Sequence, residues 1–358
     1  MKFIKQFIKK YNFLYVLLKP CVIFLRKCLD FTLRNRSLMT IKKSSNNYKN
    51  IFILDNRLLG IQFDSILLLI RGSNFFYKDK WDIIIYEDDF YRYSTLNTSK
   101  EVYSNNLVNI FFQFLLILPN PPTSIKFIKN IHELLKIIRK SNKIFPEDYN
   151  YLTNNNAYLY KDFNEKDFQN FKINQPVLKA SKYHSDIFDD YLNYRNIKKY
   201  ITITIRTKKS RIKNSNSSWD TNLDDVKLYL DYIKENNLSN HKILLIPDPN
   251  QDVPKKIINL INENNLQFEI FHHGSFSIPL RFLAYSKADF NFASSNGPAV
   301  ILFFIESSSL YILKDPWQGE DVQKFGHKIN KDLFLNKKLI FKKSKLYYET
   351  IKKNNIKT

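Results

Sequence analysis

Hydrophobic positions from residue 50 onward follow two alternating patterns along the chain. Short runs rich in Ile, Phe and Tyr are typical of buried strands, and apolar positions three or four residues apart are typical of helices that cover a sheet. The runs predict strands at 51–54, 81–88, 111–122, 199–206, 241–248, 268–273, 289–295 and 310–316, the last of which is the expected end of the sheet pattern.

Helical spacing follows most of these strands. It predicts a loop entering a helix at 55–70 and helices at 123–141, 222–237, 253–265, 278–288 and 298–307. For the helix at 123–141, the expected cap is Thr123 or Ser124, and the apolar face comprises Ile125, Ile128, Leu135 and Ile138. Because strand, loop and helix repeat in two successive series, we predict an α/β fold with two Rossmann-like domains facing a cleft.

The domain boundaries are expected where these patterns stop. Residues 146–196 are polar and aromatic with no strand pattern, although the acids at 185–191 are typical of a charged helix face. Residues 42–50 are rich in Ser, Asn and Lys, as a linker is. A chain of 358 residues suits two domains. We therefore predict a basic amphipathic segment with its linker, two Rossmann-like domains and a basic tail, at 1–49, 50–196, 197–327 and 328–358.

The formal net charge of +22 is concentrated at the two ends of the chain. Residues 1–49 contain twelve Lys and Arg against one acid, and residues 328–358 contain ten Lys against two acids. The body between them is nearly neutral, which makes it a poor surface for a duplex. Nucleic acid is therefore not an expected partner.

The N-terminal segment combines an apolar face with a basic face at helical spacing. The first comprises Ile4, Phe7, Ile8, Tyr11, Tyr15 and Leu18, and the second comprises Lys2, Lys5, Lys9 and Lys10. Charges and Pro20 interrupt the apolar stretch, which leaves it too short to span a bilayer, and no secretory cleavage pattern follows. We expect it to lie on an anionic membrane surface, helped by the C-terminal tail; packing on the body as an ordinary helix is the alternative.

Both cysteines, Cys21 and Cys28, lie in this same segment. Their spacing matches neither a metal site nor a disulfide scaffold, which indicates a reducing compartment. The expected location is therefore cytoplasmic, peripheral on the inner face of the membrane.

One stretch interrupts two apolar segments with Ser294, Ser295, Asn296, Gly297 and Pro298. Proline suits the first position of a helix, and Ser or Asn suits its cap. The backbone N–H groups at such a start are free to bind an anion, and a glycine lets a ligand approach closely. In an open α/β sheet, ligands bind where strands end and loops enter helices. This stretch is therefore a candidate phosphate cradle, with a well-capped structural turn as the alternative.

A second basic feature ends the strand at 199–206. Arg206 closes this strand, and the polar loop that follows contains Lys208, Lys209, Arg211, Trp219 and Asp220. A guanidinium at the carboxyl end of a strand lies at the edge of the sheet where ligands bind, and its planar fork suits two phosphate oxygens. A solvated charged loop is the alternative.

These features together resemble the GT-B class of glycosyltransferases, and within it bacterial surface-polysaccharide enzymes and the fucosyltransferase-like branch. The resemblance rests on the paired Rossmann-like domains and on three strand ends, "TIR", "LLIPDPNQ" and "NFASSNGPAVILFF". It covers residues 50–325 and is strongest over 200–316. It implies a sugar transferred from a nucleotide-sugar donor, bound by the C-terminal domain, to a cell-surface glycan or lipid-linked acceptor.

The resemblance also implies roles for particular residues. Arg206 and Arg211 would contact the diphosphate, and Asp248 would lie near the nucleoside. Phosphate or ribose would be held by Ser294, Ser295, Asn296 and Gly297. The stretch "LDNRLLGIQFDSILLLI" resembles the first strand, Gly turn and helix of the N-terminal domain, which would bring Arg57, Gly60 and Asp64 to the cleft, with Arg57 and Gly60 on the acceptor side.

The implied reaction has two chemical needs. Arg side chains and helix N–H groups can stabilise the departing diphosphate, so we expect no metal and no cofactor beyond the nucleotide sugar. The acceptor hydroxyl needs a base. Asp64 is the leading candidate, and Asp55 and His132 are the others.

Two other classes of function stay open. One is another transferase on the same architecture, such as a pyruvyl or phosphate-sugar enzyme. The other is a non-catalytic membrane-surface binding protein, because Asn296 stands where an acid is expected at the phosphate-binding turn. The absence of a Walker-type P-loop and of a Gly-x-Ser-x-Gly turn from the sequence argues against ATPase and hydrolase functions.

Overall fold

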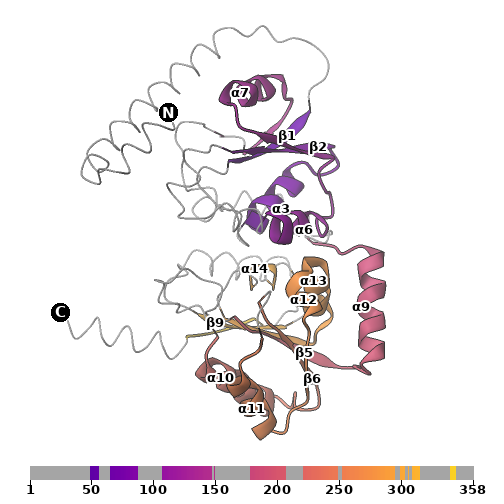
Figure 1. The fold of residues 1–358 in the computed structure, drawn as a ribbon, viewed down its shortest axis with the longest axis vertical. Coiled ribbons are helices and arrows are strands. Elements are labelled where there is room, and N and C mark those ends of the chain that lie inside the picture. Colours follow the sequence, from indigo (N-terminus) through magenta and orange to yellow (C-terminus); the bar gives the residue numbers. More distant parts are fainter. Residues whose placement is uncertain are drawn as a thin grey trace, which may run out of the picture. The chain divides into compact units, whose positions relative to one another are not determined.

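A computed structural model describes the parts of the chain that carry the regular elements (Figure 1). The described residues are 49–55, 65–87, 107–146, 149, 178–206, 221–248, 252–294, 299–302, 305, 309–314 and 339–343. The chain divides into two units. The first comprises Met1–Leu58, Asp79–Leu96 and Pro122–Asn156, and the second comprises Leu59–Lys78, Asn97–Pro121 and Ala157–Thr358.

The first unit contains a parallel four-stranded sheet in the order β3-β2-β1-β4. The strands are β1 (Asn50–Asp55), β2 (Trp81–Tyr86), β3 (Ser124–Ile128) and β4 (Ile144–Phe145). Helix α7 (Ile131–Lys140) begins at an Asn130 cap. Its Leu134 packs with alternating strand residues to form the core, which comprises Ile51, Ile53, Ile84, Tyr86, Ile128 and Leu134.

The second unit contains a parallel six-stranded sheet in the order β10-β9-β8-β5-β6-β7. The strands are β5 (Tyr200–Thr204), β6 (Lys242–Ile246), β7 (Phe268–Ile270), β8 (Phe290–Ser294), β9 (Ser309–Lys314) and β10 (Leu339–Lys343). In order of appearance this is 6-5-4-1-2-3, the doubly wound Rossmann order read from its other edge. The order of the first sheet, 3-2-1-4, matches the first four strands of that doubly wound order.

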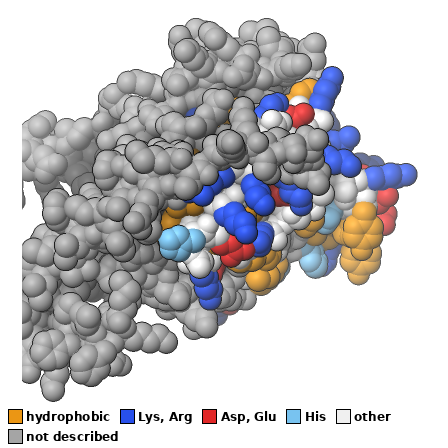
Figure 2. Space-filling model, turned by 90° about the horizontal axis from the view of Figure 1, so that it is seen from above, with side chains coloured by type: hydrophobic (Ala, Val, Ile, Leu, Met, Phe, Trp, Pro, Cys, Tyr) orange, Lys and Arg blue, Asp and Glu red, His pale blue; other side chains and the backbone are white. Residues whose placement is uncertain are grey.

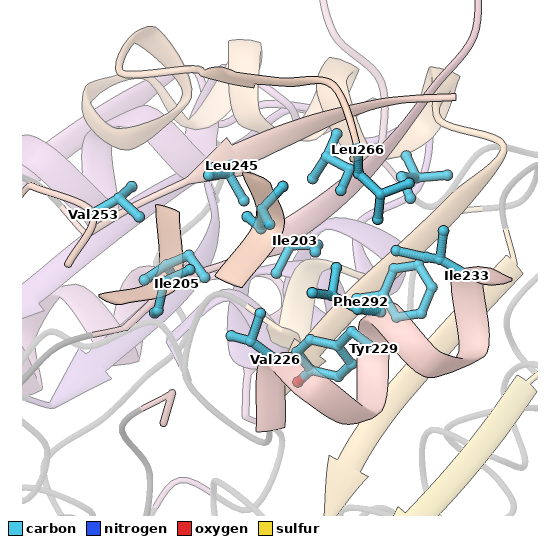
Figure 3. Packing of buried hydrophobic residues seen from close by; sticks show 14 of the residues in the cluster. Ile203, Ile205, Val226, Tyr229, Ile233, Leu245, Val253, Leu266 and Phe292 are labelled. Carbon is cyan, nitrogen blue, oxygen red and sulfur yellow. The ribbon is translucent and has the colours of Figure 1, made fainter. Parts of the chain in front are cut away.

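The main core of the second unit lies between this sheet and helices α10 (Leu223–Glu235) and α11 (Lys255–Glu263) (Figure 3). Side chains of a strand alternate between its faces, so Ile201, Ile203 and Ile205 all point to these helices. Helix α10 meets them with Val226, Tyr229 and Ile233, which are three and four residues apart. In this strand the Ile and Thr alternation of the sequence therefore separates an apolar face from a polar one.

The opposite face of this sheet carries α12 (His273–Phe276), α13 (Ile278–Lys287) and α14 (Ala299–Leu302) (Figure 1). Helix α9 (Lys182–Tyr194) packs on α13. The second unit also includes α3 (Ser65–Phe75), the π-helical turn η1 (Leu107–Phe111) and α6 (Phe112–Leu115). No described helix is long and apolar enough to cross a membrane.

The strand predicted at 111–122 is wrong, because these residues begin in η1 and α6. Phe111, Phe114 and Ile117 are buried at a spacing of three, which is helical. A short run that is apolar throughout fits a buried strand and a buried helix equally well.

The single helix predicted at 123–141 is also wrong. Residues 124–128 form β3, which extends the first sheet beside β2, and the helix begins only at Ile131. Asn130 caps it by accepting a hydrogen bond from the His132 N–H at 2.8 Å. Ser124, a predicted cap, instead donates to the Asp82 carboxylate at 2.6 Å. The partner strand therefore overrides the helical pattern of Ile125 and Ile128.

The tail predicted at 328–358 contains a strand that the sequence pattern missed. β10 pairs with β9 in parallel, so β9 is not the last strand of the sheet. The other predicted strands from 51 onward are present, with ends that differ by a few residues. The predicted α/β class with two parallel Rossmann-like sheets is confirmed, whereas the N-terminal amphipathic segment lies outside the described residues.

Lys and Arg side chains are mixed with Asp and Glu on the described part of the face in Figure 2. Exposed ion pairs of the first unit include Lys126 with Glu133 and Lys143 with Asp79, each at 2.7 Å. Pairs exposed to this degree contribute about 0–1 kcal/mol each.

Candidate functional site

The candidate site lies at the carboxyl edge of the second sheet, where the strand order reverses. β5 is the first strand of this sheet in the chain and β8 is the fourth, and they are neighbours in register, with Ile203 opposite Phe292. Helices α10 and α14, which follow β5 and β8 in the chain, lie on opposite faces of the sheet, so this is the switch point at which ligands of doubly wound sheets bind. The residues that emerge there are Arg206 from β5 and Ser294 from β8.

Thr221 holds the backbone of Arg206. The Arg206 N–H donates to the Thr221 hydroxyl at 3.1 Å, and the Thr221 N–H donates to the Arg206 carbonyl at 2.9 Å. The next residue, Asn222, caps α10 through reciprocal hydrogen bonds with Asp225. A helix start thus anchors Arg206, which lies two residues beyond the end of β5, and the Arg206 side chain is partly exposed.

The end of β6 lies beside that of β5. The Ile205 N–H donates to the Ile246 carbonyl at 2.9 Å, and Pro247 and Asp248 follow. Asp248 is partly exposed at this edge. Behind it lies Arg281 of α13, whose guanidinium donates to the Pro247 carbonyl at 3.0 Å. A cation and a carboxylate thus approach the same strand end from two elements.

A buried polar layer lies on the Thr face of β5, between the sheet and α13. Thr202 donates to the Asn291 side chain, which donates to the Tyr285 carbonyl at 3.0 Å. Thr204 and the Tyr285 hydroxyl are 2.8 Å apart. Burial raises the pKa of the Tyr285 phenol; Asp248 raises it further, whereas Arg281 and the Thr204 hydrogen bond lower it. This layer ties α13 to β5 and β8 through hydrogen bonds.

The described residues include only part of the predicted site. Arg206 and Asp248 lie at neighbouring strand ends, and the backbone of Ser294 ends β8. The other predicted site residues lie outside the described residues: Arg57, Gly60, Asp64, Arg211, Ser295, Asn296 and Gly297. Their roles stay predictions.

The two other candidate bases are both described, in the first unit. Asp55 ends β1, is 9% exposed and accepts a hydrogen bond from the Tyr149 hydroxyl at 2.8 Å. His132 is exposed in the first turn of α7. Within the described part of the chain, no group of three His, Cys, Asp or Glu residues is placed to hold a metal ion.

Sequence reasoning missed the residues that support the site from below, which are Thr204, Thr221, Arg281, Tyr285 and Asn291. Two signals were present. Arg281 interrupts an otherwise apolar helix, and Asn291 interrupts an apolar strand. A polar residue inside a buried element needs a hydrogen-bond partner, and the partners lie far away in the sequence.

No protein-family model matches the chain, and no curated protein matches it. Among solved structures, the fold is similar to a glycosyltransferase of family 9 from Veillonella parvula DSM 2008, with a TM-score of 0.41, 9% identity, and coverage of 88% of this chain and 93% of that one. It is also similar to POFUT1 in complex with GDP, with a TM-score of 0.37, 6% identity, and coverage of 74% and 96%. For POFUT1 in complex with GDP-fucose, the TM-score is 0.34 at 7% identity, with coverage of 70% and 92%. These matches describe a similarity of fold.

Proposed function

We propose that the chain is a glycosyltransferase that moves a sugar from a nucleotide-sugar donor to a cell-surface glycan or lipid-linked acceptor. The observation that carries this proposal is the place of Arg206 at the switch point of a doubly wound sheet. Ligands of such sheets bind at this point, and a guanidinium there can hold two oxygens of a diphosphate. The clamp by Thr221 supports the role, because it fixes the backbone from which this side chain extends.

The proposed reaction breaks the bond between the anomeric carbon and the diphosphate oxygen. The electron pair leaves with the diphosphate, where Arg206 stabilises the developing charge. The acceptor hydroxyl oxygen bonds to the anomeric carbon and gives its proton to a base, for which Asp64 is the proposed residue. The chemistry is proposed to need neither a metal nor a further cofactor.

The remaining residues are assigned around this centre as part of the same proposal. Asp248 lies near the nucleoside, and Arg211 contacts the diphosphate. Phosphate or ribose is held by Ser294, Ser295, Asn296 and Gly297, and the acceptor side includes Arg57 and Gly60. The enzyme acts on the cytoplasmic face of an anionic membrane, where the basic N-terminal segment would hold it near a lipid-linked acceptor.

A thermal-stability assay tests the donor half of this proposal. The probes are GDP, UDP, ADP, CDP and dTDP with their common nucleotide sugars, added to the wild type and to Arg206→Ala. A ligand at 100 times its dissociation constant stabilises the folded state by about 2.7 kcal/mol. For a unit of roughly 200 residues this corresponds to about 5–11 °C. We expect one nucleoside to give such a shift in the wild type and none in the variant.

Arg195→Ala is the matched control, because Arg195 is an exposed cation of the same unit, at the C-cap of α9, and its ion pair with Glu269 has a nitrogen–oxygen distance of 3.5 Å. It should keep the full nucleotide shift. Absence of a shift with every nucleotide would sink the glycosyltransferase proposal. Binding to anionic vesicles would then favour the membrane-surface binder, and a shift with phosphoenolpyruvate would favour a pyruvyl transferase.

A further inference from the structure

Arg281 is a buried cation in an otherwise apolar part of α13. Its side chain is 1% exposed, and its helix neighbours Phe282, Leu283 and Ala284 are buried as well. Taking a guanidinium out of water is costly unless hydrogen bonds and charges compensate it. A Met or Leu at this position of the helix would avoid the cost of burying a charge. The contacts that the guanidinium makes therefore indicate the role of Arg281.

The guanidinium joins two loops at the carboxyl edge of the second sheet. Its Nε donates to the Gly274 carbonyl at 2.6 Å, and one of its terminal nitrogens donates to the Pro247 carbonyl at 3.0 Å. Pro247 directly follows β6, and Gly274 lies in α12, just beyond β7. Because a guanidinium is planar and rigid, the two bonds fix the two carbonyls relative to each other.

Gly274 is held from the other side too. A Cβ atom at this position would lie 2.7 Å from the Phe271 ring and 3.3 Å from the Ile246 side chain. The backbone of the α12 turn therefore packs directly on the end of β6. Arg281 and this contact together hold the α12 turn against the end of β6 and the Pro247 carbonyl that follows it.

The hydrogen bond from Arg281 to the Pro247 carbonyl also bears on the next residue, Asp248. It follows Pro247, whose carbonyl Arg281 holds and whose ring fixes its own backbone. Asp248 and Arg281 also act in opposite directions on the pKa of the buried Tyr285 phenol, so all three groups share one electrostatic environment.

We propose that Arg281 is a positioning residue for the donor: it holds the loops after β6 and β7 so that Asp248 meets the nucleoside. This inference rests on the proposed function. Arg281 is too deeply buried to touch the nucleotide, so it acts through Asp248 and its loop. Its loss changes the affinity for the nucleotide and leaves the sheet intact.

A double-mutant cycle tests the coupling. The variants are Arg281→Met, which keeps an unbranched apolar stem and removes the cation, Asp248→Asn and the double variant. The probe is whichever of the five nucleoside diphosphates stabilises the wild type most. We expect each single change to weaken binding at least tenfold. The double variant should bind within about threefold of Asp248→Asn, because residues that act as one unit are not additive. Additive losses would overturn the inference while leaving the proposed function in place.

Hydrogen exchange of the ligand-free protein gives a second readout. In Arg281→Met, the amides of residues 248, 274 and 275 should exchange at least tenfold faster, while those of Ile203 and Leu244 in the sheet are unchanged. Unchanged protection in the loops would overturn the inference. Arg281→Lys keeps the charge and should recover part of both losses; it also replaces Arg281→Met if that variant does not fold.

Failure of the proposed function looks different from failure of the inference. If no nucleotide binds the wild type, the glycosyltransferase proposal falls, and with it the donor role of Arg281. If a nucleotide binds the wild type and Arg281→Met alike, only the inference falls.

Discussion

The contact between Gly274 and the end of β6 makes a sharp prediction about Gly274→Ala. Gly274 has an ordinary backbone φ, so the substitution tests space alone, without backbone strain. The added methyl would lie 2.7 and 2.8 Å from two carbons of the Phe271 ring. Carbon atoms in a packed interior prefer a separation of about 3.5–4.0 Å. The ring or the turn must therefore move by close to 1 Å.

The Phe271 ring has little room to move. It is 1% exposed, and its centroid lies 4.8 Å from that of Tyr191 and 5.5 Å from that of Phe188. If the turn moves instead, the 2.6 Å hydrogen bond from Arg281 to the Gly274 carbonyl lengthens. Overpacking of this kind costs about 1–3 kcal/mol. For a unit of roughly 200 residues, Tm should fall by about 2–12 °C.

Urea unfolding followed by far-UV circular dichroism measures this cost. Ser275→Ala is the matched control, because it changes the adjacent buried residue, whose hydroxyl makes no hydrogen bond to any described residue. It should lie within about 0.5 kcal/mol of the wild type. Phe271→Leu should relieve the clash, so the double variant should be no less stable than Phe271→Leu alone. Equal stability of Gly274→Ala and Ser275→Ala would refute the reasoning.

Two further predictions concern tyrosines of the second unit. Tyr285→Phe leaves the buried Thr204 hydroxyl without its 2.8 Å partner, so urea unfolding should show a loss of about 1–3 kcal/mol, and adding Thr204→Val should recover part of it. Burial raises the pKa of Tyr191 from 10.0 to about 12; the charge of Glu269 raises it as well, whereas the charge of Arg195 lowers it. The folded state therefore holds this proton longer than the unfolded state, and the associated stability is lost as pH rises from about 10 to 12. In Tyr191→Phe, the free energy of unfolding should fall less steeply with pH over that range. At pH 7 it should match the wild type, since the hydroxyl has no hydrogen-bond partner in the described structure. An unchanged dependence of stability on alkaline pH would contradict this.

The central strands of the second sheet could be predicted from the sequence, because their signal is local. In "ITITI" the alternation of Ile and Thr fixes a strand with one apolar face, and its Ile residues do pack under α10 and α11. Arg206 follows from the same pattern, since it ends the strand predicted at 199–206; β5 itself ends at Thr204. The helix predicted at 278–288 is present as α13, whose first turn is capped by Ser277 and contains Pro279.

Two edge strands, β3 and β10, could not be predicted in this way, although the edge strand β7 was. β3 and β10 are terminal strands of their sheets, with a neighbour on one side only. Their sequences, "SIKFI" and "LIFKK", carry charges and short apolar stretches that fit a helix or a tail as well as a strand. Pairing with β2 and β9 decides their structure, and no local pattern names that partner.

The sequence by itself determined the class of fold and the position of Arg206 just beyond β5, because side-chain period and the approximate ends of strands are properties of neighbouring residues. Only the tertiary structure brought Arg281 behind Asp248 and joined Thr204 to Tyr285 across 81 positions of the chain. A buried polar group needs a partner wherever the fold provides one. That partner is set by how α13 crosses the sheet, which depends on contacts between segments far apart in the chain.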